Sequence, residues 1–407
     1  MSRLLRLAAT AALAMLLTLS VFSGCAKQST DTTTGELPDA ATPETMPSAG
    51  MTIPSGPADQ LISAGVAMME RGDFQGAKAQ FTGAVQANPN SAEAHYNLGL
   101  ARELTGDLSG ALASYRQATS LLPDFHEARI NSGAVQIRSG DARAALGFYR
   151  SLTQRNPNDI GAWTNLGVAQ MAVGNYGEAQ SALRKAISLD YKFIAARINL
   201  GVMYYRQDKV GLALEVFDRT KPMAPQDPLL LYWIGMSWAK LDSWERATPS
   251  LERAANGAPG FSAAQNNYGV ALARSGDFNK AKQSFEQALV ADPTNAQALI
   301  NLGAAKRRLG DTAGAEADYK RAQVLDPRNA GIYLNLAILY ADDLGKPELA
   351  AKNFRNYYSM SSGDPERIER VQQWIKKAEQ NASAPPPAEP TPPAEPPAQP
   401  ETPPEVQ

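Results

Sequence analysis

Residues 92–125, AEAHYNLGLARELTGDLSGALASYRQATSLLPDF, set a pattern that the chain repeats every 34 residues. A glycine stands at the same place in each repeat, at Gly65, Gly99, Gly133, Gly167, Gly201, Gly235, Gly269 and Gly303. An alanine follows twelve residues after each glycine, from Ala77 to Ala315, and most repeats close with a proline. Self-similarity at a fixed period of this length predicts stacked copies of one supersecondary structure.

Each repeat is predicted to form two helices, which in the quoted stretch are residues 92–105 and 108–121. Gly99 is small, so the backbones of the two helices can approach closely. Between them, Gly106 can adopt the left-handed conformation that stops the first helix, and Asp107 can cap the second. A single helix pair cannot bury its apolar sides alone, so neighbouring repeats are expected to stack.

This pattern resembles the tetratricopeptide repeat (TPR) family. The resemblance implies an all-α, right-handed solenoid of about nine helix-turn-helix repeats over residues 58–363. Eight repeats are in register from Ala58 to Asn329, and the ninth carries a one-residue shift. Residues 364–381 follow as a predicted capping helix, because a terminal repeat needs its open side covered. The apolar side of that helix is formed by Ile368, Val371, Trp374, Ile375 and Ala378.

The N-terminal residues 1–24 contain two arginines and a long apolar run, which is typical of a secretory signal peptide. Ser23 and Gly24 directly before Cys25 resemble the lipobox of bacterial lipoproteins, in which the signal is removed and the cysteine carries lipid. The resemblance implies a protein anchored in the cell envelope. Ala26 after the cysteine is compatible with an outer-membrane position facing the periplasm. An uncleaved anchor or a soluble secreted protein is the alternative.

Two further segments lack hydrophobic periodicity. Residues 25–57, which begin with the lipidated cysteine, are rich in Thr, Ser, Gly, Pro and Ala, and they are expected to form a flexible tether. Residues 382–407 contain eleven prolines, four glutamates and no basic residue. This composition predicts a disordered Pro/Glu-rich tail that acts as an extended spacer.

Charge and chemistry argue against several classes of protein. The chain has 39 basic and 41 acidic residues and a net charge of −2, which is not the balance of a nucleic-acid binder. Its two histidines, His95 and His126, have no metal-binding or catalytic constellation around them in the sequence. We therefore expect that the protein is not an enzyme and that it binds no metal ion and no cofactor. Membrane contact is expected through the lipid anchor only.

In the TPR family the first helix of each repeat lines the concave surface, and the residue two before the repeat glycine faces inward. The resemblance therefore implies a ladder at Asn97, Asn131, Asn165, Asn199, Trp233, Asn267, Asn301 and Asn335. An amide carries both a donor and an acceptor, so it can pair with a peptide backbone in either direction. The ladder is similar to that of the TPR superhelix of O-GlcNAc transferase. Alternatively, these asparagines make hydrogen bonds to the neighbouring backbone. Trp233, which takes the place of an asparagine in the ladder, is the expected anchor for a ligand.

A second inward position, five residues after the repeat glycine, is basic in most repeats. The residues are Arg138, Arg206, Lys240, Arg274 and Arg308. Guanidinium groups recognise carboxylates through paired hydrogen bonds, so the predicted partner is a protein or peptide segment rich in Asp or Glu, or a free C-terminus. The alternative is a basic row that is solvated or paired within the chain.

These features together predict a lipid-anchored envelope adaptor that holds extended or acidic protein segments in its concave groove. In general design it resembles the TPR lipoproteins that assist assembly of pilus, secretion or cell-wall systems. The alternative is a passive structural scaffold or spacer whose groove is unoccupied.

Overall fold

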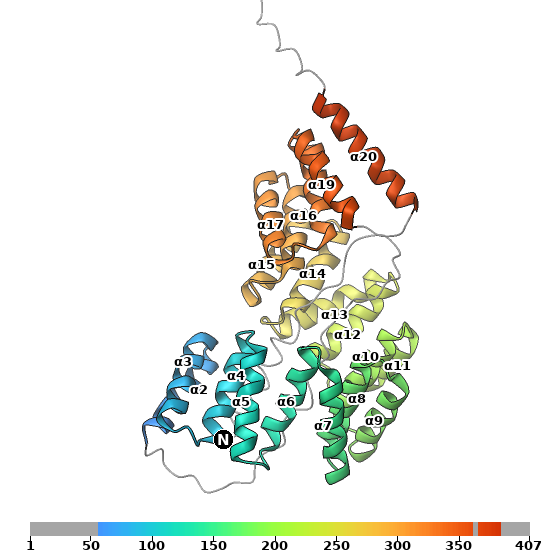
Figure 1. Ribbon diagram of the computed structural model, residues 1–407. Coiled ribbons are helices and arrows are strands. Elements are labelled where there is room, and N and C mark those ends of the chain that lie inside the picture. Colours follow the sequence, from blue (N-terminus) through green and yellow to red (C-terminus); the bar gives the residue numbers. More distant parts are fainter. Residues whose placement is uncertain (1–55, 361–364, 384–407) are drawn as a thin grey trace, which may run out of the picture. The chain divides into compact units, whose positions relative to one another are not determined.

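A computed structural model of the chain describes residues 56–360 and 365–383 (Figure 1). Within these ranges the regular elements are all helical, and they fall into two compact units divided between Ile332 and Tyr333. The predicted signal peptide, Cys25, the tether up to residue 55 and the tail from residue 384 lie outside the described residues. No helix of the described residues is long and apolar enough to cross a bilayer.

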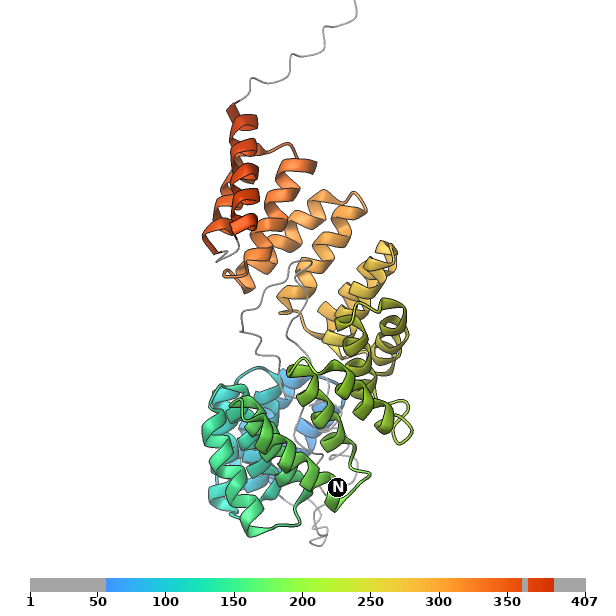
Figure 2. The ribbon, with the colours of Figure 1, turned by 90° about the vertical axis from the view of Figure 1, so that its right-hand side faces the viewer.

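The first unit is built from pairs of helices, one pair for each 34-residue repeat. The first helices are α2 (Pro57–Glu70), α4 (Ala92–Leu104), α6 (His126–Arg138), α8 (Ile160–Ala172), α10 (Ile194–Arg206), α12 (Pro228–Lys240), α14 (Ser262–Arg274) and α16 (Ala296–Arg308). The second helices are α3 (Phe74–Ala87), α5 (Leu108–Leu121), α7 (Ala142–Arg155), α9 (Tyr176–Leu189), α11 (Val210–Thr220), α13 (Trp244–Gly257), α15 (Phe278–Ala291) and α17 (Thr312–Leu325). Each first helix packs on its own second helix, and each second helix packs on the next first helix (Figures 1 and 2). The predicted all-α helix-turn-helix repeat is confirmed.

The turn between the two helices follows the predicted chemistry. Gly106 has a φ of +81°, and the corresponding glycines of most repeats are also left-handed. The Asp107 side chain then accepts a hydrogen bond from the backbone N–H of Gly110 at 2.9 Å, which caps α5. In two repeats the left-handed position is taken by an aspartate instead, Asp208 at φ +62° and Asp242 at φ +56°. Neither aspartate was predicted from the sequence to take this position.

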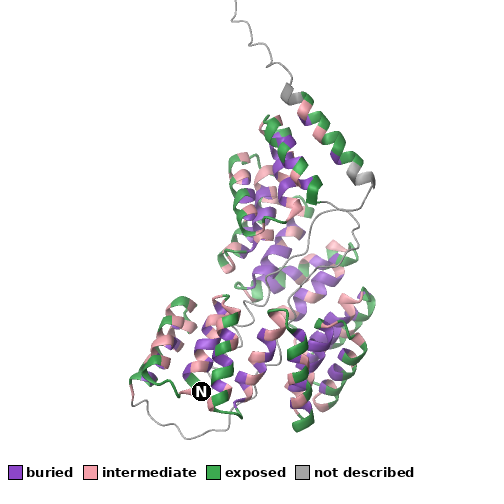
Figure 3. Cartoon of the chain, in the orientation of Figure 1, coloured by how far each residue is buried: buried purple, intermediate pink, exposed green. Residues whose placement is uncertain are grey.

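The two helices of a repeat meet at the repeat glycine and a large side chain sixteen residues later. A Cβ atom added to Gly99 would lie 2.5 Å from the Tyr115 ring, and one added to Gly201 would lie 2.2 Å from the Phe217 ring. Both rings are fully buried. Figure 3 shows the buried residues along the sides of the helices that face one another. The glycine is therefore required by close packing, as predicted, and the partner ring fills the seam.

The ninth repeat absorbs its extra residue in a π-helical turn. Its first helix, α18 (Ala330–Ile338), continues into the π-helix η1 (Leu339–Asp343) before α19 (Pro347–Met360) begins. The Leu344 N–H donates to the Leu339 carbonyl at 3.1 Å, which is the five-residue spacing of a π-turn. A single inserted residue is accommodated in this way without breaking the helix.

In the second unit, α20 (Pro365–Ser383) packs against α19 over the segment predicted as the capping helix. Val371 and Ala378 are buried, and the Trp374 ring lies 5.6 Å from the Phe354 ring. Arg355 of α19 and Glu379 of α20 form an ion pair. The side chain of Ile368, which was also assigned to the apolar side, lies outside the described residues.

We predict that Gly201→Ala lowers the free energy of unfolding by about 1–3 kcal/mol, because the new methyl group overlaps the Phe217 ring. Gly147→Ala is the matched control, since this helical glycine has nothing within 4 Å of an added Cβ. The control should gain about 0.5–1 kcal/mol from helix propensity. Urea denaturation followed by circular dichroism measures both variants. Equal stability of the two would contradict the packing assigned to the glycine.

Candidate functional site

The predicted ladder positions lie in the middle of the first helices, from Asn97 in α4 to Asn301 in α16, with Asn335 in α18. We call the surface that carries the seven positions of α4 to α16 the ladder face. Neighbouring first helices touch there. The Asn301 amide donates to Asn266 Oδ1 at 2.9 Å, and Asn267 donates to the Tyr232 hydroxyl at 3.2 Å, each across 35 residues. Asn131 approaches the Tyr96 hydroxyl in the same way at 3.4 Å.

The asparagines of the ladder differ in burial. Asn165 and Asn199 are 0% and 1% exposed, and Asn267 is also buried. Asn97, Asn131 and Asn301 are half-buried. The amides in the middle of the ladder are thus set into the layer of first helices, which the sequence pattern alone did not predict.

Unpartnered polar atoms gather on this face. The described residues contain six buried side-chain polar atoms without a hydrogen-bond partner: Asn165 Nδ2 and Oδ1, Asn199 Oδ1, Trp233 Nε1, Arg138 Nε and Glu127 Oε2. Five of the six belong to predicted ladder or basic positions on the consecutive first helices α6, α8, α10 and α12. A buried polar group without a partner costs about 1–3 kcal/mol. These atoms therefore hold hydrogen-bonding capacity that no group of the described residues uses.

Trp233 replaces asparagine in the ladder and belongs to an aromatic cluster. Its ring meets those of Tyr205 and Tyr232 edge-on, each with centroids 5.3 Å apart. Burial raises the pKa of Tyr205 to about 12. Trp238 and Trp244 pack against the same core cluster and are partly buried. The guanidinium carbon of Arg274 lies 4.5 Å from the centroid of the Trp244 ring.

Members of the basic row have different surroundings. Arg138 forms a salt bridge to Glu103 at 2.5 Å, with both side chains only 12% exposed, and Tyr115 donates to the other Glu103 oxygen. Burial raises the pKa of Glu103, while the Arg138 charge lowers it. For Arg206, burial lowers the guanidinium pKa. Arg138 is therefore neutralised inside the chain, as the alternative interpretation of the row expected.

Lys240 and Arg274 are each joined to the left-handed aspartate of the preceding repeat. Lys240 Nζ lies 2.9 Å from Asp208 Oδ1, and this contact lowers the Asp208 pKa. Arg274 Nη1 lies 3.7 Å from Asp242 Oδ1. Arg308 stacks at 5.1 Å from the Phe278 ring centroid, and no carboxylate of the described residues pairs with it.

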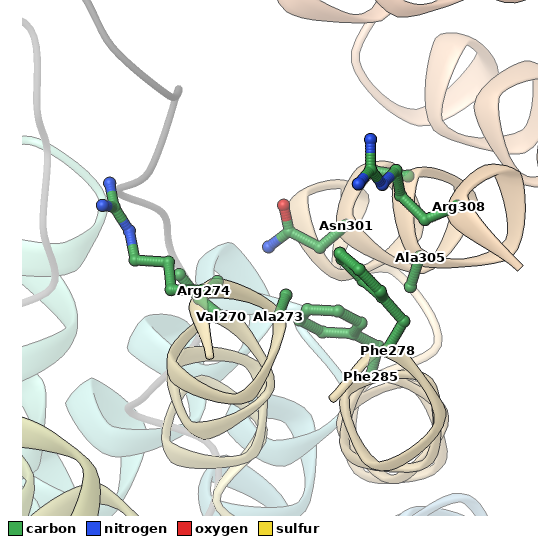
Figure 4. A pocket seen from close by; sticks show the side chains of 9 residues that line it. Val270, Ala273, Arg274, Phe278, Phe285, Asn301, Ala305 and Arg308 are labelled. Atoms are coloured by element: carbon green, nitrogen blue, oxygen red, sulfur yellow. The ribbon is translucent and has the colours of Figure 1, made fainter. Parts of the chain in front are cut away.

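A pocket of about 260 Å³ lies between α14, α15 and α16. Its lining is mostly apolar and consists of Val270, Ala273, Phe278, Phe285, Ala304 and Ala305, together with Arg274, Asn301 and Arg308. Three of the predicted site residues are thus brought together at one place. Figure 4 shows the two phenylalanine rings between the helices, with the Asn301 amide between the two guanidinium groups.

The described residues contain no group of three side chains suited to hold a metal ion. His126 Nε2 lies 3.5 Å from Asp159 Oδ2, a carboxylate that the sequence analysis did not place beside it. His95 Nε2 contacts the Pro89 carbonyl oxygen at 2.9 Å. His95 thus contacts the turn before its own helix, whereas His126 at the start of α6 contacts the N-cap residue of α8 in the next repeat.

Comparison with known proteins gives one family. The family model described as tetratricopeptide repeat matches residues 63–124, 105–160, 164–228, 234–296, 269–330 and 300–365. No curated protein matches the chain in sequence.

Several solved structures are similar in fold. A chain of the APC/C hetero-tetramer Cut9–Hcn1 has a TM-score of 0.55 and 16% identity, with 79% of this chain and 76% of that chain covered. Pseudomonas aeruginosa pilF has a TM-score of 0.47 and 19% identity, over 53% of this chain and 96% of that one. YrrB, described as a TPR protein with an unusual peptide-binding site, has a TM-score of 0.37 and 22% identity, over 45% and 95%.

We predict opposite consequences for two arginines of the basic row. Arg138→Met should lower the free energy of unfolding by about 3 kcal/mol, because it leaves Glu103 buried without its cation. Arg308→Met, the matched control, removes no ion pair of the described residues and should change stability by less than about 0.5 kcal/mol. Denaturant titration of both variants measures the difference. A stable Arg138→Met variant would show that the salt bridge is dispensable.

Proposed function

The chain belongs to the tetratricopeptide repeat family, and from that premise we propose that it is an adaptor holding an extended segment of a partner protein along the ladder face. Proteins of this family mediate protein–protein interactions. The segment would lie across the first helices from α6 to α16, where the ladder and the basic row face the same surface. The protein would work by binding rather than by catalysis.

The observation that carries this proposal is the set of unpartnered atoms at Arg138, Asn165, Asn199 and Trp233. An extended peptide presents main-chain N–H and C=O groups in alternation, and each asparagine amide can pair with one of either kind. The Trp233 indole N–H is a donor only, so it would bind a carbonyl oxygen. Recognition of main-chain groups at these positions would accept many sequences, and side-chain contacts elsewhere would select among them.

We further propose that the adaptor is anchored in a bacterial cell envelope through lipid on Cys25 and serves the assembly of an envelope complex. The support is the sequence alone: the apolar run, the small residues before Cys25, and the single cysteine in the chain. Labelled palmitate should enter the wild-type chain and not a Cys25→Ala variant. If both variants are labelled equally, or if neither is labelled, Cys25 does not carry the lipid anchor.

The groove-binding proposal predicts position-dependent capture in living cells. A photoreactive phenylalanine analogue in place of Trp233 or Asn301 should crosslink one and the same partner protein, because both positions lie on the ladder face. Val290 and Val324 are the matched controls, since both are highly exposed and lie on the second helices α15 and α17.

Mass spectrometry of the crosslinked products identifies what is captured at each position. Capture of one partner from the ladder positions and none from the valines is the expected result. Capture from the valines alone would place binding on the second helices. No specific capture from any of the four positions would favour the alternative, a passive scaffold whose ladder face is unoccupied.

A further inference from the structure

We propose that the pocket between α14, α15 and α16 selects the bound segment by taking an apolar side chain next to an acidic residue, whose carboxylate pairs with Arg308. This inference rests on the proposed function and names the ligand sequence that the ladder face prefers. It follows from a contact that Lys240 and Arg274 make within the chain and that Arg308 does not make.

Two members of the basic row already have a carboxylate of the chain beside them. Lys240 and Arg274 contact Asp208 and Asp242, in each case the residue 32 positions earlier in the sequence. For Arg308 the residue at that spacing is Gly276, which carries no side chain. The carboxylate position beside Arg308 is therefore one that a ligand can take.

The two aspartates are kept at this place against a backbone preference. Asp208 and Asp242 are the two non-glycine residues of the described part of the chain with positive φ, where glycine is favoured. A left-handed L-residue costs about 1–2 kcal/mol, and an exposed ion pair contributes less than that. Turn geometry alone would thus select glycine, as it does at Gly276. The aspartates neutralise two members of the basic row, whereas Arg308 has no carboxylate partner among the described residues.

Arg308 lies beside an aromatic ring. Its guanidinium carbon is 5.1 Å from the centroid of the Phe278 ring, within the range of a cation–π contact, and no carboxylate of the described residues pairs with it. Arg274 stacks on Trp244 in the same manner one repeat earlier. The paired N–H donors of a guanidinium can bind both oxygens of a carboxylate at once, so a carboxylate is the preferred partner for Arg308.

The apolar part of the pocket fixes what lies next to that carboxylate. Phe278 and Phe285 of α15 line the pocket together with Ala304 and Ala305 of α16. A pocket of this size has room for one large aliphatic or aromatic side chain. Because Arg308 and Ala304 line the same pocket, the acidic and apolar residues of the ligand must be close neighbours in its sequence.

Selection from a random library tests the proposal without knowledge of the natural partner. Random dodecapeptides, displayed inside a flanking protein sequence so that they have no free ends, are selected on the full chain. We expect enrichment of Asp or Glu beside a large apolar residue. Selection on Arg308→Glu should instead enrich Lys or Arg beside the apolar residue, a reversal that loss of folding cannot produce.

Two further variants separate the parts of the pocket. Ala304→Leu fills the apolar space and should abolish the preference for a large neighbour while the acidic preference stays. Arg184→Glu makes the same charge change on an exposed position of the second helix α9 and should select the same peptides as the wild type. A selected acidic peptide should bind Arg308→Glu about tenfold more weakly or worse, and Arg184→Glu equally well.

The outcomes distinguish this inference from the proposed function. Enriched peptides without an acidic–apolar pair, but sensitive to Asn199→Ala, would overturn the inference and leave ladder binding intact. Acidic peptides with no apolar neighbour, unaffected by Ala304→Leu, would reduce the site to a simple anion contact and also overturn it. Failure to enrich any peptide on the folded chain would sink both proposals.

Discussion

The close contact between the repeat glycine and a large side chain sixteen residues later governs the rest of the structure. Gly99 meets Tyr115 and Gly201 meets Phe217, and any side chain in place of the glycine would overlap the ring. The contact fixes the spacing of the two helices within a repeat. Because it recurs every 34 residues, it brings one position of each first helix onto a common surface, and the ladder face follows from it.

The charged and hydrogen-bonding groups of the ladder face are paired to different extents along its length. Toward its start, Arg138 is neutralised by Glu103, and in the middle the amides of Asn165 and Asn199 are buried with unpartnered atoms. Toward its end, aspartates neutralise Lys240 and Arg274 while Arg308 keeps its charge beside an apolar pocket. In the proposed function, main-chain binding and side-chain selectivity would thus be located on different repeats of one face. An adaptor that must hold a long segment firmly and still choose among segments needs both.

The sequence predicted the features that depend on spacing alone. The helix pairs, the left-handed glycine of the turn and the aspartate cap follow from residue type and a fixed period, whereas the ladder was implied by the resemblance to the TPR family. The π-helical turn of the ninth repeat was visible only as a one-residue shift, because a shift in register does not say how the backbone absorbs it.

The features that the sequence did not predict depend on contacts between repeats. The salt bridge of Arg138 with Glu103 joins residues 35 apart, and its burial depends on the packing of α4 against α6. The aspartates at Asp208 and Asp242 were not recognised because a glycine usually stops the helix at that place. The pocket combines residues of three helices, so no single motif encodes it. Each of these required the geometry of neighbouring helices.

The central claim is that the buried amides of the ladder bind the main chain of an extended segment. A crystal structure of the chain with a selected or captured peptide tests this most directly. The account predicts peptide N–H or C=O groups at hydrogen-bonding distance, about 3 Å, from the amides of Asn165 and Asn199 and from Trp233 Nε1. A peptide bound across the second helices, with these atoms still lacking a protein or peptide partner, would contradict it.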